Sequence, residues 1–405
     1  MSLTIHARHV LAWDGADHRL VEDGTVVVDG DTLTYVGPRD GAPPGGDGDE
    51  VLDAGEALVA PGFVDLNALG DVDHHLIVAA VPAERADELQ WSRNFFAHRR
   101  REQMSADDEA AKSRYAYAAL LLNGITTAMP ITSTIPKLHG ETFAEVAAAA
   151  GHAADLGLRV YLGPSYLQGK HVRDDLGGYS VRLFDEDVVG PGLAAAERFI
   201  EEFEGAAGGL VRTCVVPERV ELQTIDSLRA SKELARRRGV PMRLHAAQGV
   251  FEYRYIRDRT GLSPIRFLDS LGLLDEGTFV PHAHLASGHP AADDAGDADL
   301  DVLRDTGTTV IHCPQVQARW GEALHSFGRY TRHGISMAMG TDTWPADMVE
   351  NCRLGSYVSR ILDSDSPESG FASFYRAATV GGADALGRPD LGRLAAGCRA
   401  DLVVF

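Results

Sequence analysis

Three residues whose side chains can bind metal ions or transfer protons stand at the ends of apolar segments of the chain. They are His245, His282 and Asp342. Short apolar segments of this kind are typical of buried strands, and in α/β barrels the residues at strand ends carry catalysis. A carboxylate such as that of Asp342 needs a charged partner if it is buried in such a place. We therefore expect these three side chains to share one pocket.

The elements that would position them alternate between strand and helix. Eight candidate strands span residues 62–66, 125–130, 159–163, 211–216, 242–246, 278–282, 308–313 and 335–340. Helical apolar spacing occurs between or after them at 105–123, 141–156, 193–204, 226–238, 348–362 and 371–386. This alternation indicates a TIM-type (β/α)₈ barrel over residues 58–386, with the active site at the carboxyl ends of the strands. A doubly wound open sheet is the alternative, but no glycine-rich phosphate motif follows any strand.

Both ends of the chain are rich in β-forming residues. Residues 1–57 contain short β-rich runs at 3–9, 25–29 and 32–36, with Asp-Gly turn signals at 14–15, 23–24 and 29–30. Residues 387–405 end in a further strand. Since neither segment is large enough to fold alone, we expect them to form one small β-sandwich domain together.

Composition narrows the range of partners and locations. The chain has 405 residues, a net charge of −21 and 44% hydrophobic residues, which suits a large core. Such a charge repels nucleic-acid phosphates and anionic membranes, so we expect a small-molecule substrate. No apolar run is long enough for a membrane helix, and the N-terminus lacks a signal pattern, which predicts a cytoplasmic protein. The cysteines form no CxxC pair and are expected to be free thiols: Cys214, Cys313, Cys352 and Cys398.

Short motifs along almost the whole chain carry a family resemblance. In chain order they are Val59-Ala-Pro-Gly-Phe-Val-Asp65, Leu121-Leu-Asn-Gly-Ile-Thr-Thr127, His245 with Gln248, Pro281-His-Ala-His-Leu285, His312-Cys-Pro314, Gly340-Thr-Asp-Thr343 and the run from Leu391 to Val404. Together they resemble the amidohydrolase superfamily, in the branch of triazine chlorohydrolases, guanine deaminase and adenosine-derivative deaminases. Relatives usually continue beyond the position of Phe405, so further strands are expected there.

The resemblance implies both a reaction and roles for residues. In this family, two strand-one histidines, a strand-five histidine and a strand-eight aspartate hold a divalent metal. His245 matches the strand-five ligand, and Asp342 matches the aspartate that also takes a proton from the metal-bound water. His282 matches the histidine that polarises the scissile bond. The implied protein is a homodimeric hydrolase that cleaves a C–N bond of a small, nitrogen-containing heterocycle.

Three positions depart from this pattern. Asn67 and Leu69 stand where the histidine pair would be, and Gln248 stands where the family has a proton-shuttling glutamate. Leucine cannot bind a metal, and an amide has no titratable proton for acid–base work. One interpretation is therefore a metal-free lyase, isomerase or hydrolase, in which Asp342 and His245 act as an acid–base pair. A non-catalytic binding protein is a further alternative.

The other interpretation is a rearranged site for one zinc, iron or manganese ion. Asp71, Asp73 or His74, just after the first strand, would complete a ligand set with His245 and Asp342, and with His282 if it also binds. The simpler alternative for this segment is a solvated loop or a helix start, with an aspartate as its cap.

Substrate contacts are expected from loops at the same end of the barrel. The candidates are Asn67, Tyr166, Gln168, His171, Arg173, His312 and Arg319. If the cationic residues among them converge, the substrate carries an anionic group. Otherwise they are ordinary charges of a surface loop.

Overall fold

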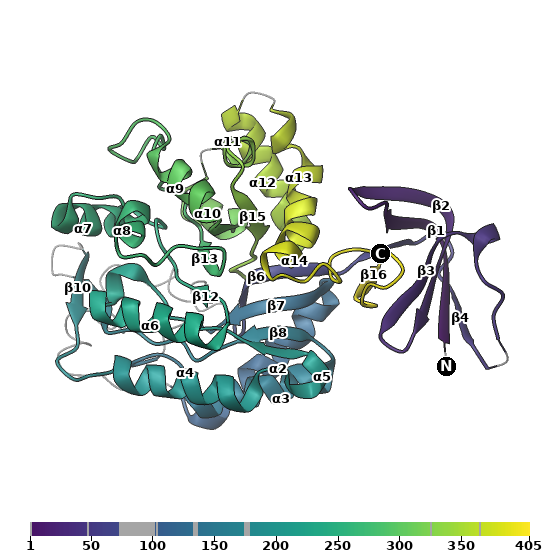
Figure 1. Ribbon diagram of the computed structural model, residues 1–405, viewed down its shortest axis with the longest axis horizontal. Coiled ribbons are helices and arrows are strands. Elements are labelled where there is room, and N and C mark those ends of the chain that lie inside the picture. Colours follow the sequence, from purple (N-terminus) through teal and green to yellow (C-terminus); the bar gives the residue numbers. More distant parts are fainter. Residues whose placement is uncertain are drawn as a thin grey trace, which may run out of the picture.

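The computed structural model describes residues 2–46, 48–72, 102, 104–132, 137–173, 179–324, 326–363 and 366–405. Within these residues the chain forms a larger α/β body and a smaller β-rich part that contains both chain ends (Figure 1). None of the helices in the described part of the chain has the length and apolar character needed to span a lipid bilayer.

Parallel strands form the centre of the larger body. They are β6 (Phe63–Leu69), β7 (Ile125–Ile131), β8 (Arg159–Leu162), β11 (Val211–Thr213), β12 (Met242–Arg243), β13 (Thr278–Pro281), β14 (Thr309–His312) and β15 (Ser336–Met339). Hydrogen bonds order them as β11-β8-β7-β6 in one sheet and β12-β13-β14-β15 in another. A parallel bridge between Val215 and Met242 joins the two sheets on one side. On the other side, the segment after β15 meets the end of β6, and every predicted strand of this body is present.

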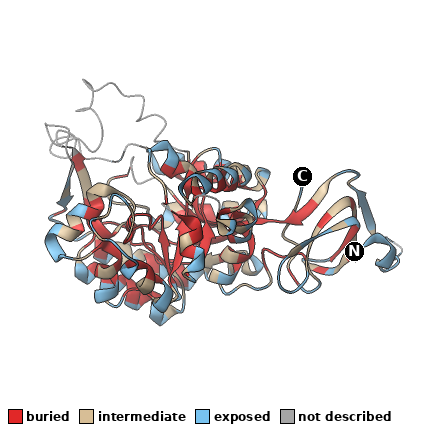
Figure 2. Ribbon diagram, turned by 90° about the horizontal axis from the view of Figure 1, so that it is seen from above, coloured by how far each residue is buried: buried red, intermediate tan, exposed pale blue. Residues whose placement is uncertain are grey.

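Helices surround these strands, with their buried faces turned inward (Figure 2). They include α2 (Ala106–Leu122), α3 (Phe143–Leu156), α4 (Val189–Phe203), α6 (Ile225–Arg238), α7 (Val250–Thr260), α8 (Pro264–Ser270), α9 (Ala298–Thr306), α10 (Pro314–Arg319), α11 (Phe327–Arg332) and α12 (Met348–Asp363). The predicted helix 371–386 is divided into α13 (Phe371–Arg376), a π-helical turn (Ala377–Gly381) and α14 (Gly382–Ala385).

Local signals set the ends of the helices that lead into the strands. The Ser105 hydroxyl accepts a hydrogen bond of 3.2 Å from the backbone N–H of Asp108, and α2 starts there. Gly124, just after this helix, has a φ of 76°, a value that glycine adopts readily. The chain turns at this residue and enters β7 at once. The helix predicted from residue 105 onward is therefore present, with Ser105 as its N-cap.

The smaller part is one hydrogen-bonded sheet made from both ends of the chain. It contains β1 (Ser2–Trp13), β2 (His18–Asp29), β3 (Thr32–Pro38), β4 (Glu50–Asp53), β5 (Leu58–Pro61) and β16 (Leu402–Val404). Strand β16 pairs antiparallel with β5, so the C-terminal strand returns as expected. The predicted turn at residues 23–24 is wrong: Asp23, with a φ of 48°, lies inside β2, where its carboxylate accepts a hydrogen bond from Arg8 at 2.9 Å. The sandwich arrangement stays a prediction.

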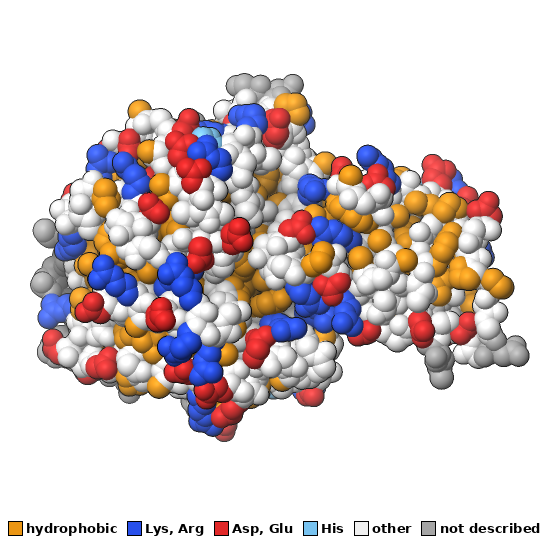
Figure 3. All heavy atoms as spheres, viewed as in Figure 1, with side chains coloured by type: hydrophobic (Ala, Val, Ile, Leu, Met, Phe, Trp, Pro, Cys, Tyr) orange, Lys and Arg blue, Asp and Glu red, His pale blue; other side chains and the backbone are white. Residues whose placement is uncertain are grey.

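The surface mixes charges of both signs. On the face drawn in Figure 3, acidic and basic side chains lie next to one another over the helices. Many of them form ion pairs, such as Arg237 with Glu197 at 2.7 Å on neighbouring helices.

Candidate active site

The structure brings His245, His282 and Asp342 together at the carboxyl ends of their strands. Nε2 of His282 lies 3.4 Å from Oδ2 of Asp342, and the ring centroids of His245 and His282 are 5.4 Å apart. His282 directly follows β13, whereas His245 and Asp342 come a few residues after β12 and β15. The strand ends thus deliver two imidazoles and a carboxylate to one place.

Two of these residues have an unusual backbone conformation. His282 has a φ of 70° and Asp342 a φ of 45°, both in the left-handed region that costs an ordinary residue about 1–2 kcal/mol. Backbone contacts hold them there, since the N–H of His282 donates to Ile311 O at 2.8 Å and that of Asp342 to Asn67 O at 2.8 Å. Such strain is common at active sites, where the surrounding fold fixes the side-chain direction.

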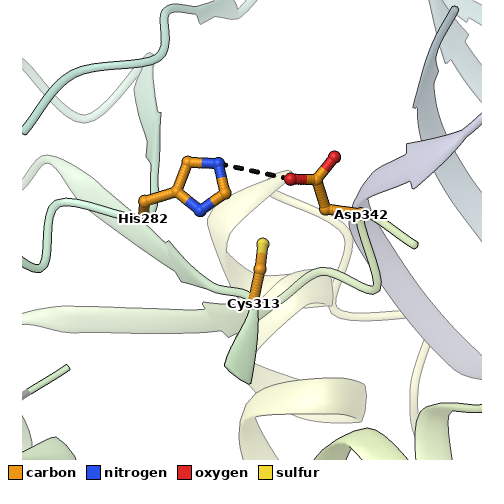
Figure 4. Close-up of side chains that lie close together, drawn as sticks. All are labelled: His282, Cys313 and Asp342. Carbon is orange, nitrogen blue, oxygen red and sulfur yellow. Dashed lines mark ion pairs between the residues drawn. The ribbon is translucent and has the colours of Figure 1, made fainter. Parts of the chain in front are cut away.

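Cys313, which the sequence analysis did not assign to the site, lies close to His282 and Asp342. Sγ of Cys313, a nitrogen of His282 and a carboxylate oxygen of Asp342 all lie within 4.8 Å of one another. Figure 4 shows the three side chains directed toward a common point. Cys313 directly follows β14 and is fully buried. Its position after an apolar strand was the signal that could have identified it.

The protonation state of His245 follows from its hydrogen bond. Nδ1 of His245 lies 2.9 Å from the carbonyl oxygen of Glu218, and a carbonyl only accepts hydrogen bonds. Nδ1 therefore carries the hydrogen, which leaves the lone pair on Nε2. Burial, together with the charges of Arg219 and Arg243, lowers the pKa of His245 well below its ordinary value, so the ring is neutral.

His282 is neutral for similar reasons. Its side chain is fully buried, and burial followed by the neighbouring His245 lowers its pKa well below the ordinary value. Within the described residues, neither ring nitrogen of His282 makes a hydrogen bond, although Nε2 is in ion-pair range of Asp342. A buried, neutral imidazole can bind a metal ion or a substrate through the lone pair of a ring nitrogen.

Of the two amides that replace family residues, Asn67 is buried and Gln248 is half-buried. Asn67 is fully buried near the end of β6, and its Nδ2 lies 3.7 Å from Cys313 Sγ. Asn67 Oδ1 and Gln248 Oε1 have no hydrogen-bond partner within the described residues. Buried polar atoms without a protein partner commonly mark a place where water, an ion or a ligand binds.

The strand-one loop does not deliver Asp71 to this cluster. Oδ2 of Asp71 lies 3.1 Å from Lys112 Nζ, and Lys112 also contacts Glu109 at 2.8 Å. This carboxylate therefore belongs to a buried ion-pair group beside α2. Asp73 and His74, the other residues considered as ligands, lie outside the described residues.

Several predicted substrate contacts have structural partners instead. The Tyr166 hydroxyl donates to Ser231 Oγ at 2.8 Å inside the core. Nε2 of Gln168 donates to the carbonyl oxygens of Phe184 and Glu186, which braces the hairpin of β9 (Gly169–Arg173) and β10 (Tyr179–Leu183). Both side chains are thus used by the scaffold.

Of the remaining predicted substrate contacts, His171 and Arg319 have protein partners, and the side chain of Arg173 is not described. Nε2 of His171 lies 2.9 Å from Glu221 Oε1, and the side chain of Arg173 is outside the described part of the chain. Arg319 donates to the Thr343 hydroxyl and, at 2.8 Å, to the carbonyl oxygen of Trp344, which fixes the loop after Asp342.

His312 is a packing residue in this structure. Its ring lies 5.8 Å from the ring of Phe327 and 5.9 Å from that of Phe374, measured between centroids. Burial lowers the pKa of His312 to about 3, so the ring is neutral.

Two buried titratable residues that the sequence analysis missed make hydrogen bonds to the backbone around the barrel strands. The buried carboxylate of Glu252 accepts the backbone N–H groups of Ala247 at 2.5 Å and Gln248 at 2.9 Å, which fixes the turn after His245. The fully buried Arg243 donates to the carbonyl oxygens of Met129 and, at 3.1 Å, Pro130. It thereby ties β12 to β7 across the barrel.

Comparison with known proteins shows the family of this chain. Residues 58–405 match the amidohydrolase family. The chain belongs to that family. A 5-methylthioadenosine/S-adenosylhomocysteine deaminase from Natronomonas pharaonis is 29% identical over 366 residues, which cover 88% of this chain and 75% of that protein. A protein of the same name from Moorella thermoacetica is 25% identical and covers 95% of this chain and 82% of its own length.

Solved structures agree on the fold. Atrazine chlorohydrolase from Arthrobacter aurescens TC1, crystallised with zinc, superposes with a TM-score of 0.79 at 22% identity, covering 100% of this chain and 87% of the other. Guanine deaminase from E. coli gives a TM-score of 0.77 at 16% identity, covering 100% and 88%. The predicted α/β fold of TIM-barrel type, the predicted superfamily and the predicted class, a hydrolase acting on C–N bonds other than peptide bonds, are confirmed.

The donor atoms of the site fit a divalent cation, as the family implies. Zinc accepts nitrogen, sulfur and carboxylate oxygen ligands, whereas calcium and magnesium prefer oxygen alone. The site offers neutral imidazoles on His245 and His282, the Asp342 carboxylate and the Cys313 thiol. Among the residues that the structure describes, the ring nitrogens of His282 have no hydrogen-bond partner, and this observation favours a bound cation here.

Proposed function

We propose that this chain is a metal-dependent deaminase, which removes an amino group from a small nitrogen heterocycle as ammonia. The observation that carries this proposal is the contact between His282 and Asp342, 3.4 Å apart, with His245 beside them in an amidohydrolase fold. The named activities of the deaminase relatives support the choice of an amino group over other leaving groups.

A divalent cation would be held by Asp342 and His282, which are close enough to share it, with the Nε2 lone pair of His245 nearby. When bound, such a cation lowers the pKa of a water molecule to about 7, which makes the water a nucleophile at neutral pH. Zinc is the ion that the mixed donor set suits best, with iron and manganese as the alternatives.

Asp342 moves the protons in this reaction. Water adds to the ring carbon that bears the amino group, and the Asp342 carboxylate accepts the proton that the water loses. The carboxyl group passes this proton to the ring nitrogen next to that carbon, and it then carries the proton of the added hydroxyl group to the departing amine. The C–N bond breaks, ammonia leaves, and the ring keeps the oxygen as a carbonyl group.

The groups beside Asp342 stabilise negative charge and orient the substrate. His282 lies against Asp342, and a cation held between the two would stabilise the negative charge that develops on the attacking oxygen. Gln248 has no proton to transfer, but its amide can bind a ring nitrogen of the substrate. Asp342 must therefore serve for both proton transfers, the work that the family divides between an aspartate and a glutamate.

Ammonia release tests the proposal. Purified protein would be assayed with 5′-methylthioadenosine, adenosine, guanine and a chlorotriazine, beside an Asp342→Asn variant. We expect ammonia from an amino-purine substrate, and at least a ~100-fold loss of turnover in the variant. Chloride release from the triazine without ammonia would contradict the deaminase proposal. Tight binding of a heterocycle with no turnover would identify a non-catalytic relative.

We further propose a division into a barrel (58–386) and a small β-domain (1–57 with 387–405), and a homodimer in the cytoplasm. Strand β16 pairing with β5 supports the joint domain, and the four free, buried cysteines suit a reducing compartment. Light scattering coupled to size-exclusion chromatography measures the oligomeric state, and a monomer mass would contradict the dimer.

A further inference from the structure

We propose that the metal ligands of this chain are His282, Cys313 and Asp342, so that a cysteine thiolate compensates for the missing strand-one histidines. The cation would then lie among the ends of β13, β14 and β15. This inference rests on the metal-dependent form of the proposed function.

The three donors come from consecutive strands. His282 and Cys313 each directly follow their strand, and Asp342 lies a few residues after β15. Neighbouring strands run about 4.8 Å apart, so residues at their ends are natural neighbours. In tetrahedral zinc sites with bond lengths of about 2.0–2.3 Å, ligand atoms are about 3.3–3.8 Å apart. The 3.4 Å between His282 and Asp342 already fits, and the limit of 4.8 Å for the whole group requires only a small side-chain adjustment.

The surroundings of the cluster point independently to a ligand. His282 is fully buried, yet neither ring nitrogen has a hydrogen-bond partner in the described part of the chain. The described residues therefore leave both ring nitrogens open to a ligand. A cation between His282 and its two neighbours would give the ring a partner.

Asn67 would support Cys313 as a metal ligand. Its Nδ2 lies 3.7 Å from Cys313 Sγ and donates toward the sulfur. An N–H group directed at a sulfur favours the thiolate, and hydrogen bonds of this kind tune metal-bound cysteines. The replacement of a ligand histidine by asparagine is therefore consistent with a change of ligand set as well as with a loss of metal.

Charge balance also supports the cysteine. A thiolate and a carboxylate together carry two negative charges, which would neutralise a divalent cation among these largely buried residues. Three protein ligands leave a fourth position open for water, as catalytic zinc requires. His245 lies beside His282 and is left to contact whatever occupies that position.

Cobalt substitution tests the ligand set without relying on activity. The metal-free protein would be titrated with Co²⁺, and thiolate ligation reported by a near-ultraviolet charge-transfer band. Cys313→Ser is compared with Cys214→Ser, because Cys214 is equally buried and its Sγ lies against Tyr161 O at 3.6 Å, outside the cluster. We expect one Co²⁺ and the band in the wild type and in Cys214→Ser. In Cys313→Ser we expect no band and at least ~10-fold weaker cobalt binding.

X-ray absorption of the zinc-loaded wild type removes any dependence on the folding of a variant. One sulfur neighbour at about 2.3 Å supports the proposal, and nitrogen and oxygen neighbours alone overturn it. Bound metal without sulfur overturns only the ligand set and leaves the metal-dependent deaminase in place. Ammonia release by a protein that binds no cobalt overturns the ligand set and the metal dependence together.

Discussion

Asp342 donates its backbone N–H to the carbonyl oxygen of Asn67 over 2.8 Å, which joins the segment after the last barrel strand to the end of the first. Both residues belong to the candidate site. Close by, the buried Asp65 carboxylate accepts hydrogen bonds from the backbone N–H of Thr341 at 3.1 Å and from its hydroxyl at 2.5 Å. The contact between the first and last barrel strands and the position of the Asp342 carboxylate therefore depend on neighbouring hydrogen bonds.

The Asp342 carboxylate can be removed without disturbing these hydrogen bonds. Asparagine tolerates a positive φ better than most residues, so Asp342→Asn keeps the backbone and removes the carboxylate that is proposed as proton acceptor and metal ligand. We expect turnover to fall at least ~100-fold, while the free energy of unfolding changes by less than about 1 kcal/mol. Steady-state ammonia release and urea unfolding measure the two quantities.

Asp269→Asn is the matched control, since Asp269 is exposed on α8. Its activity should equal that of the wild type. Full activity in Asp342→Asn would show that another group transfers the protons.

Glu252 should make stability depend on pH. Burial raises its pKa from 4.5 to about 8, so the folded protein holds a proton that the unfolded chain loses at lower pH. The contribution of this residue is complete below about pH 4.5 and is lost as the pH rises toward 8, with a slope of up to about 1.4 kcal/mol per pH unit. Glu252→Gln stays neutral and should flatten the dependence, as urea unfolding between pH 5 and 8 would show.

The exposed Glu233, on α6, provides the comparison for this experiment. Glu233→Gln should retain the slope of the wild type. If Glu252→Gln retains it too, Glu252 is ionised in the folded protein at neutral pH.

Arg243 should be one of the most sensitive positions of the barrel. Its planar guanidinium donates hydrogen bonds to the carbonyl oxygens of both Met129 and Pro130, and a lysine cannot reproduce that geometry. We expect Arg243→Lys to lower the free energy of unfolding by about 2–4 kcal/mol, because buried carbonyl groups lose their donors. Thermal or urea unfolding measures the loss.

Arg229, exposed on α6, is the control for the same substitution. Arg229→Lys should change stability by less than about 0.5 kcal/mol. An equally small effect at Arg243 would mean that water replaces the lost donors.

The larger body could be predicted because its signals are local. Each strand is a short apolar run and each helix has its own spacing, as in the stretch from Ser105 to Gly124, where cap, helix and turn all follow from neighbouring residues. His245, His282 and Asp342 could be assigned to one end of the barrel for the same reason. Parallel strands bring their carboxyl ends together wherever they occur in the sequence.

Side-chain direction could not be predicted in this way. Tyr166 follows a barrel strand, yet its hydroxyl binds Ser231 in the core, because packing against α6 decides where the ring lies. Glu252 resembles any charged residue of a helix until the turn after His245 folds back onto its carboxylate. Cys313 was predicted only to be a free thiol, because its nearness to His282 and Asp342 depends on the stagger of three strands.

Metal dependence of ammonia release tests the central claim most directly. The protein would be assayed with an amino-purine substrate as purified, after removal of metal by a chelator, and after addition of one equivalent of Zn²⁺. We predict that chelation abolishes ammonia release and that one equivalent of zinc restores it. Undiminished release by protein shown to contain no metal would contradict the account and would favour metal-free acid–base catalysis by Asp342 and His245.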